Sequence, residues 1–154
     1  MTRHKNVFRQ EPKDFRGKSL RSKKFVKRYL FDADFRDLEL DEALFDEAML
    51  EGARFDDSSL TQASIRNAHL AHTKFRNVDL TNADVSYDRD FPRKKNSCFY
   101  ADFSGSTLEN TNFSRSPMTY ARFERATLVS ANFNRTTLIA ADFTSSNMKD
   151  SDLR

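Results

Sequence analysis

Residue types that carry out chemistry are few in this 154-residue chain, which contains three histidines and one cysteine. His69 and His72 have the His-x-x-His spacing of a metal pair, but no cysteine lies near them and both fall at positions expected on an outward corner. The single Cys98 cannot form a disulfide within one chain, and its apolar register predicts core filler, with a reactive thiol as the alternative. Serine, threonine and aspartate are abundant everywhere, so spacing alone picks out no catalytic triad. We therefore predict no enzyme, no metal site and no cofactor.

Charge is the second chemical signal, and it is unevenly distributed. Residues 1–30 carry 11 Lys/Arg against 2 Asp/Glu, whereas residues 31–57 carry 2 against 11. The two runs predict two candidate binding surfaces. The basic end consists of Lys13, Lys18, Lys23 and Arg28. The acidic patch consists of Asp32, Asp34, Asp37, Glu39, Asp41, Glu42, Asp46 and Glu47.

Each charged surface has two interpretations. The basic end either provides solubility and caps a rod, with its side chains snorkelling outward, or binds a polyanion or an acidic partner. The acidic patch either neutralises the basic residues beside it or imitates the phosphates of a nucleic acid. Direct binding of nucleic acid by the chain itself is not expected.

The sequence has a strict five-residue period, and this period determines where these residues lie. Apolar residues recur at every fifth position from Phe15 to Val85, and again in a shifted register from Cys98 to Leu153. This period fits neither a helix nor a strand, so each unit must be a short extended piece followed by a corner. Small residues dominate two positions before each apolar centre, as two inward-facing positions of a narrow tube require.

A finer pattern predicts how the tube is filled. Phenylalanine falls at alternate centres, and 11 of the 15 phenylalanines are centres. If the tube has four sides, phenylalanine occupies two opposite walls, and its rings stack from coil to coil. Leucine and methionine fill the other two walls.

Several segments share one motif, among them 33–37 (ADFRD), 53–57 (ARFDD), 101–105 (ADFSG) and 131–135 (ANFNR). They resemble the pentapeptide repeat, Ala-(Asp/Asn)-(Leu/Phe)-X-X. The resemblance covers residues 13–154 with one break and implies an all-β fold, a right-handed quadrilateral β-helix of about seven coils at four repeats per coil. We expect residues 1–12 to form a basic N-terminal arm and residues 13–30 to form a basic capping coil. The alternative is a short capping helix over residues 19–30.

One interruption breaks the array. Thirteen residues separate Val85 from Cys98, where the period requires five. The count predicts a loop at residues 86–97 that leaves the columns aligned, with Phe103 above Phe75. An aromatic residue beside basic residues at a loop tip is typical of an interface anchor. The candidate partner-binding residues are Tyr87, Phe91, Arg93, Lys94 and Lys95; the alternative is an inert insertion.

The last coil supplies a fourth candidate surface. Phe143, Met148 and Leu153 are expected to be exposed there, so we predict that two chains form a homodimer through this end. With no apolar stretch long enough to span a membrane, we expect a cytoplasmic bacterial protein with no membrane partner.

The favoured function is a non-enzymatic scaffold that presents charged walls and one loop to a protein partner. The resemblance implies a second function, because some pentapeptide repeat proteins imitate DNA, bind the type II topoisomerases DNA gyrase or topoisomerase IV, and protect them from quinolones or toxins. The net charge of +3 counts against this function. A third possibility is an exported bacterial effector.

Overall fold

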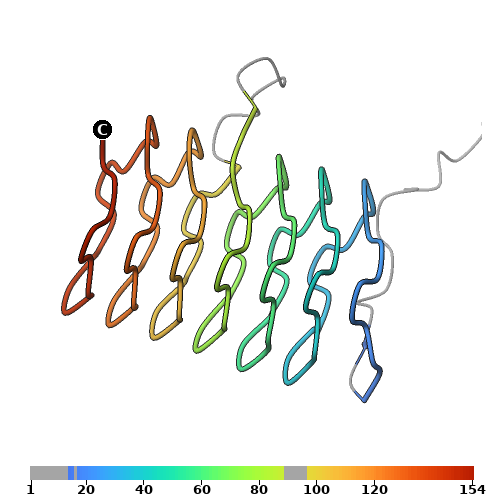
Figure 1. Cartoon of the computed structure of the whole chain (residues 1–154). Coiled ribbons are helices and arrows are strands. Elements are labelled where there is room, and N and C mark those ends of the chain that lie inside the picture. The colour runs from blue at the N-terminus through green and yellow to red at the C-terminus, as the bar shows by residue number, and fades with distance from the viewer. Residues whose placement is uncertain (1–13, 16, 89–96) are drawn as a thin grey trace, which may run out of the picture.

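The computed structural model describes residues 14–15, 17–88 and 97–154. Across these residues the chain winds as a stack of coils that runs from one end of the molecule to the other (Figure 1). Parallel bridges join residues 20 positions apart, such as Asp34 to Arg54 and Arg54 to Lys74. The described residues contain no helix, and no strand is longer than a single bridged residue.

Four walls follow from this 20-residue register, and each is identified by its apolar centres. The first wall contains Phe15, Phe35, Phe55, Phe75, Phe103, Phe123 and Phe143. The second contains Leu20, Leu40, Leu60, Leu80, Leu108, Leu128 and Met148, and the third contains Phe25, Phe45, Ile65, Val85, Phe113, Phe133 and Leu153. The fourth contains Leu30, Leu50, Leu70, Cys98, Met118 and Leu138.

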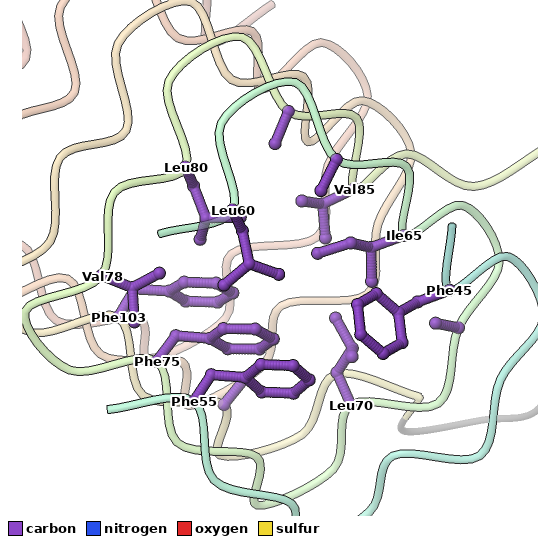
Figure 2. Close-up of a cluster of buried hydrophobic side chains, with 14 of the residues drawn as sticks. Phe45, Phe55, Leu60, Ile65, Leu70, Phe75, Val78, Leu80, Val85 and Phe103 are labelled. Atoms are coloured by element: carbon purple, nitrogen blue, oxygen red, sulfur yellow. The ribbon is translucent and has the colours of Figure 1, made fainter. Parts of the chain in front are cut away.

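The core is a double column of phenylalanine rings. Within the first wall, Phe35 and Phe55 stack with ring centroids 4.8 Å apart and planes 8° apart. Across the interior, Phe45 of the third wall meets Phe35 edge to face at 5.5 Å. Figure 2 shows Phe55, Phe75 and Phe103 lying one above the next, with leucine side chains filling the space beside them. The predicted phenylalanine columns on two opposite walls are confirmed.

The first coil settles the choice between coil and helix. Lys24 is bridged to Leu44 and Tyr29 to Met49, so residues 19–30 follow the same repeat as the rest of the rod. The prediction of a coil is confirmed there, and the alternative of a capping helix is wrong. The physical reason is the register, because the backbone N–H groups of this coil donate to carbonyl oxygens 19 residues later, as in Phe25 N–H to Leu44 O at 2.7 Å.

Each corner is a tight turn whose third residue has a positive φ. In the turn that starts at Leu40, Ala43 N–H donates to Leu40 O at 3.0 Å, and Glu42 has φ 59°. A type II turn needs this left-handed conformation at its third residue, and asparagine and aspartate tolerate it better than most residues. Their abundance outside the core positions therefore has a structural cause.

Serine and threonine at the small inward position are buried without an energetic penalty. Thr73 Oγ1 donates to Leu50 O at 2.8 Å, and Thr111 Oγ1 makes the same bond to Leu80 O. Ser106 Oγ both donates to Phe75 O and accepts from Val78 N–H at 3.0 Å. Because each hydroxyl bonds to the coil beneath it, the narrow interior accepts these residues in place of alanine.

The interruption leaves the columns intact. Lys74 is bridged to Asp102 across a spacing of 28 residues instead of 20. Phe75 and Phe103 stack at 4.9 Å with planes only 1° apart. The prediction that Phe103 lies above Phe75 is confirmed.

Candidate interaction surfaces

The basic first coil and the acidic second coil neutralise one another. Arg21 pairs with Asp41 at 3.2 Å and with Glu42 at 3.6 Å, and Lys27 pairs with Glu47 at 3.5 Å. These partners lie about one coil apart in sequence, so the fold places them one above the other. Part of the charge asymmetry of the sequence is thereby converted into contacts between coils.

Other carboxylates of the acidic patch are also engaged. Asp34 accepts two hydrogen bonds from the Arg36 guanidinium, and Asp46 accepts from Ser64 Oγ at 2.5 Å. Asp41 is only 8% exposed. Burial alone would raise its pKa, but hydrogen bonds from Ser59 and Thr61 outweigh burial and lower it. Asp32, Asp37 and Glu39 lie exposed at the surface.

The basic end turns toward solvent. Lys18, Lys23 and Arg28 occupy the small inward position of their repeats, yet all three are exposed. Lys18 Nζ lies 5.4 Å from the centre of the Phe15 ring, so its cationic head reaches back over the first aromatic ring. Lys13 lies outside the described residues.

The partner-binding loop needs one correction. Tyr87 is only 3% exposed, and its hydroxyl donates to Ala68 O inside the rod. Burial raises the pKa of this hydroxyl above its ordinary value. The prediction that Tyr87 contacts a partner is therefore wrong, because its ring closes the coil from which the chain departs. Phe91, Arg93, Lys94 and Lys95 lie outside the described residues.

The C-terminal coil exposes part of its apolar centres. Leu153 is 56% exposed, whereas Phe143 and Met148 are partly buried against the core. By contrast, Phe133, one coil further in, is 1% exposed. The dimer assigned to this end stays a prediction.

The first wall carries a groove of about 340 Å³ lined by charged side chains. Asp56 lies in it between two guanidiniums, accepting from Arg76 Nε at 3.0 Å and from Arg54 Nη2 at 2.8 Å. Burial alone would raise the pKa of Asp56, but these hydrogen bonds outweigh burial and lower it. Since the carboxylate already holds both guanidiniums, the groove serves the stability of the wall better than it would serve an anionic ligand.

The fourth wall carries a surface that the sequence analysis missed. The rings of His72 and Tyr100 stack at 5.3 Å, and those of Tyr100 and Tyr120 stack at 5.0 Å. Phe99 packs edge to face on both tyrosines, at 4.5 and 5.2 Å. Tyr100 and Tyr120 are 44% and 40% exposed, and the neighbouring Ile139 is 64% exposed. We call these five residues the aromatic ladder.

The ladder lies on the part of the fourth wall that carries no charge. The fourth-wall segments 68–72, 97–100, 116–120 and 136–140 contain no Asp, Glu, Lys or Arg. The other walls carry charged residues over the same coils. A partly exposed run of aromatic rings on an uncharged wall has the composition of an interface core rather than of ordinary solvated surface.

The cysteine and histidine side chains that the structure describes lie in or on the fourth wall. Cys98 is fully buried in the fourth wall, and burial raises the pKa of its thiol, as expected of core filler. His72 stacks in the aromatic ladder. No group of three histidine, cysteine, aspartate or glutamate residues within 14–15, 17–88 and 97–154 is arranged to hold a metal ion. The described part of the chain also contains no helix able to cross a membrane.

Comparisons with known proteins agree with the repeat. A family model of pentapeptide repeats matches residues 29–67, 58–87, 97–135 and 118–154. No curated protein matches the chain. Among solved structures, a pentapeptide repeat protein from the thylakoid lumen of Arabidopsis thaliana is 27% identical, covering 73% of this chain and 66% of that one, with a TM-score of 0.44.

Two further solved structures are similar at lower identity. HetL, a pentapeptide repeat protein involved in the regulation of heterocyst differentiation in the cyanobacterium Nostoc sp. strain PCC 7120, is 24% identical, over 90% of this chain and 59% of its own, with a TM-score of 0.41. QnrB1, a plasmid-mediated fluoroquinolone resistance protein, is 20% identical, over 87% and 76%, with a TM-score of 0.38. The chain thus spans 66% and 59% of the length of the first two proteins.

Proposed function

The chain belongs to the pentapeptide repeat family, and on that premise we propose that it is a non-enzymatic scaffold that binds a protein partner. Proteins of this family are generally non-catalytic. The interior of the rod is filled by its own side chains, so recognition has to take place on the outer walls.

The aromatic ladder is the observation that carries this proposal. Three side chains of the ladder, Tyr100, Tyr120 and Ile139, are each at least 40% exposed on the uncharged part of the fourth wall. Exposed aromatic rings held rigid by their neighbours lose little conformational entropy on binding, and aromatic residues are enriched among interface hot spots. The charged walls and the loop residues Phe91, Arg93, Lys94 and Lys95 are proposed as secondary contacts.

A pull-down from the native cell tests the scaffold. Immobilised wild-type protein should retain a partner that the double variant Tyr100→Asp/Tyr120→Asp does not retain. Val26→Asp is the matched control, because Val26 is 38% exposed on the third wall, away from the ladder. Variants with Phe91→Ala, or with Arg93, Lys94 and Lys95 neutralised, measure the loop. A wild-type protein that retains no partner would overturn the proposal.

A topoisomerase-binding DNA mimic is the alternative proposal. The ion pairs of Asp41, Glu42 and Glu47 with the first coil count against it, because a phosphate mimic needs carboxylates available to the partner. The deciding assay is DNA gyrase supercoiling, with and without a fluoroquinolone. No effect at tenfold excess of the protein would exclude this alternative. An exported effector predicts instead that deletion of residues 1–12 abolishes export and leaves the rod folded.

A homodimer through the C-terminal coil is a separate proposal. Leu153 is 56% exposed, and Met148 and Phe143 lie partly buried beside it, so their pairing in a second copy would remove apolar surface from water. Light scattering should give the mass of two chains, and Leu153→Arg should reduce it to one. A single-chain mass for the wild type at high micromolar concentration would contradict the dimer.

A further inference from the structure

The stacked rings of the aromatic ladder end at Tyr120, one coil before the end of their column. His72, Tyr100 and Tyr120 occupy the same corner of the fourth wall in successive coils, and the next residue of that column is Ala140. Tyr100 has a stacked ring on each side, at 5.3 and 5.0 Å. Among the residues that the structure describes, Tyr120 has a stacked ring only on the side of Tyr100. The column therefore stops at an aromatic face with only a methyl group below it.

The backbone at the next position of the column, Ala140, is suited to an aromatic side chain. Ala140 has φ 53°, close to the 57° of both Tyr100 and Tyr120, so the corner has the same backbone conformation with and without an aromatic side chain. Ala140 is exposed, and Ile139 beside it is 64% exposed. A ring placed over Ala140 would stack on Tyr120 and contact the aliphatic side chain of Ile139.

We propose that this open rung, formed by Tyr120, Ile139 and Ala140, binds an aromatic side chain carried by an uncharged segment of a protein partner. The inference rests on the proposed scaffold function and specifies the chemistry of its partner. Stacked aromatic pairs are stabilised beyond the burial of their surface, so one inserted ring would act as an anchor.

Charge favours a peptide over a nucleic acid. A nucleobase would stack on Tyr120 equally well, but nucleic acids need lysine or arginine beside them to neutralise phosphate. The fourth-wall segments 97–100, 116–120 and 136–140 supply none. A charged peptide would likewise lose hydration on this wall without gaining a counter-charge.

Size favours a peptide over a second copy of the chain. With coils about 4.8 Å apart and a wall about three extended residues wide, the uncharged strip of four coils measures roughly 20 by 10 Å. Its area of roughly 200 Å² is well below the 800 Å² per partner typical of a stable protein interface. The strip is large enough for a few residues of an extended segment with one anchoring ring.

A titration monitored by amide NMR tests the rung directly. The probe is N-acetyl-tryptophanamide, and N-acetyl-leucinamide and adenosine monophosphate are the comparison solutes. We expect saturable ring-current shifts at the amides of residues 119–121 and 138–141 with the tryptophan probe alone. The chain itself contains no tryptophan, so the fluorescence of the probe gives a second readout of binding without background.

Two variants test the rung, one by filling it and the other by removing its stacking face. Ala140→Tyr should extend the ladder by one ring, fill the rung from within and weaken probe binding at least tenfold. Tyr120→Ala should remove the stacking face and weaken binding to a similar degree. Val26→Ala is the control and should bind the probe like the wild type. The amide spectrum of each variant shows whether its fold is retained, and the two variants give independent answers.

Several results would contradict the inference or the scaffold function on which it rests. Shifts that do not saturate, that persist in Ala140→Tyr, or that appear equally with N-acetyl-leucinamide overturn the inference. Stronger binding of adenosine monophosphate than of the tryptophan probe overturns it in favour of a nucleic acid. In the pull-down, a partner retained equally by wild type and Ala140→Tyr refutes the rung and leaves the scaffold standing. A wild type that retains no partner refutes the scaffold itself.

Discussion

Phe75 is a first-wall residue with a stacked phenylalanine ring on both sides. Its ring is fully buried between Phe55 at 4.8 Å and Phe103 at 4.9 Å. We expect Phe75→Ala to lower the free energy of unfolding by about 3–5 kcal/mol, because a narrow filled tube cannot collapse around the cavity. Urea denaturation measures the loss. Phe143→Ala is the control and should cost less than half as much, since Phe143 is only partly buried. Equal losses would contradict the prediction.

Asp56 gives the rod a predictable dependence on pH. Burial alone would raise its pKa, but hydrogen bonds from Arg76 and Arg54 outweigh burial, so the folded-state pKa lies below the ordinary value of 3.8. Its contribution to stability is therefore complete above pH 3.8 and is lost as the pH falls through the lower folded-state pKa. We expect Asp56→Asn to be less stable than the wild type at pH 7, and the difference to shrink below pH 4. Urea denaturation at a series of pH values checks this, and a difference independent of pH would refute it.

Single residues were predictable where the period fixes their direction. Every centre from Leu30 to Phe133 is buried as expected. The sequence itself shows the alternation of large and small residues that point inward. Tyr87 was not predictable, because it stands where the chain leaves the coil. At that point the period no longer determines whether a side chain lies on the surface or closes the core.

The corner turns differ in what they tolerate, although their backbone is the same. Gly105 has φ 72°, and a methyl group there would lie 2.5 Å from Asn77 Oδ1. Gly17 has φ 73° with nothing within 4 Å, so Gly17→Ala measures the backbone cost alone. We expect Gly105→Ala to cost about 0.5–1.5 kcal/mol more than Gly17→Ala, because the Asn77 side chain must move and give up its hydrogen bond to Asp57.

A double variant identifies the cause. Asn77→Ser removes the amide that blocks the methyl group, so Gly105→Ala should cost less in that background, with a coupling of at least about 0.5 kcal/mol. Thermal unfolding of the four proteins gives this coupling. Additive effects would mean that the backbone conformation, and not the Asn77 side chain, excludes alanine from this corner.

The walls were predictable from the repeat, and the same residue spacings could have revealed the aromatic ladder. Tyr100 and Tyr120 lie 20 residues apart, and His72 lies 28 before Tyr100, the spacings that align the first-wall rings on either side of the interruption. Taken alone, each of the three is an ordinary outward residue at a turn. Only alignment of the outward columns, in addition to the inward ones, reveals that the rings stack. Exposure and ring geometry then require coordinates.

Across the whole molecule, charge is arranged to join neighbouring coils. The basic first coil has its counter-charges one coil away, in Arg21 with Asp41 and Lys27 with Glu47. The sequence showed the asymmetry but left open whether the acidic run was a binding surface or a neutralising layer. Part of the acidic run pairs with the first coil, whereas Asp32, Asp37 and Glu39 are exposed, so the acidic patch stays a predicted binding surface. The uncharged part of the fourth wall, over residues 68–72, 97–100, 116–120 and 136–140, is a second distinctive outer surface of the described rod.

A stack of coils should also open from its ends. Each coil contacts only the coils next to it, so stability is close to a sum over neighbours, and inner coils need more contacts broken before they exchange. The amide of Phe75, bonded to Asp102 O at 2.7 Å, lies in the middle of the stack, whereas those of Phe25 and Phe133 bond at the same distance near its two ends. Hydrogen exchange should be at least about tenfold slower at Phe75 than at the other two, because one broken interface costs more than 1.4 kcal/mol. Identical exchange at all three amides would mean that the rod opens only as a single cooperative unit, and the neighbour-by-neighbour account of its stability would be wrong.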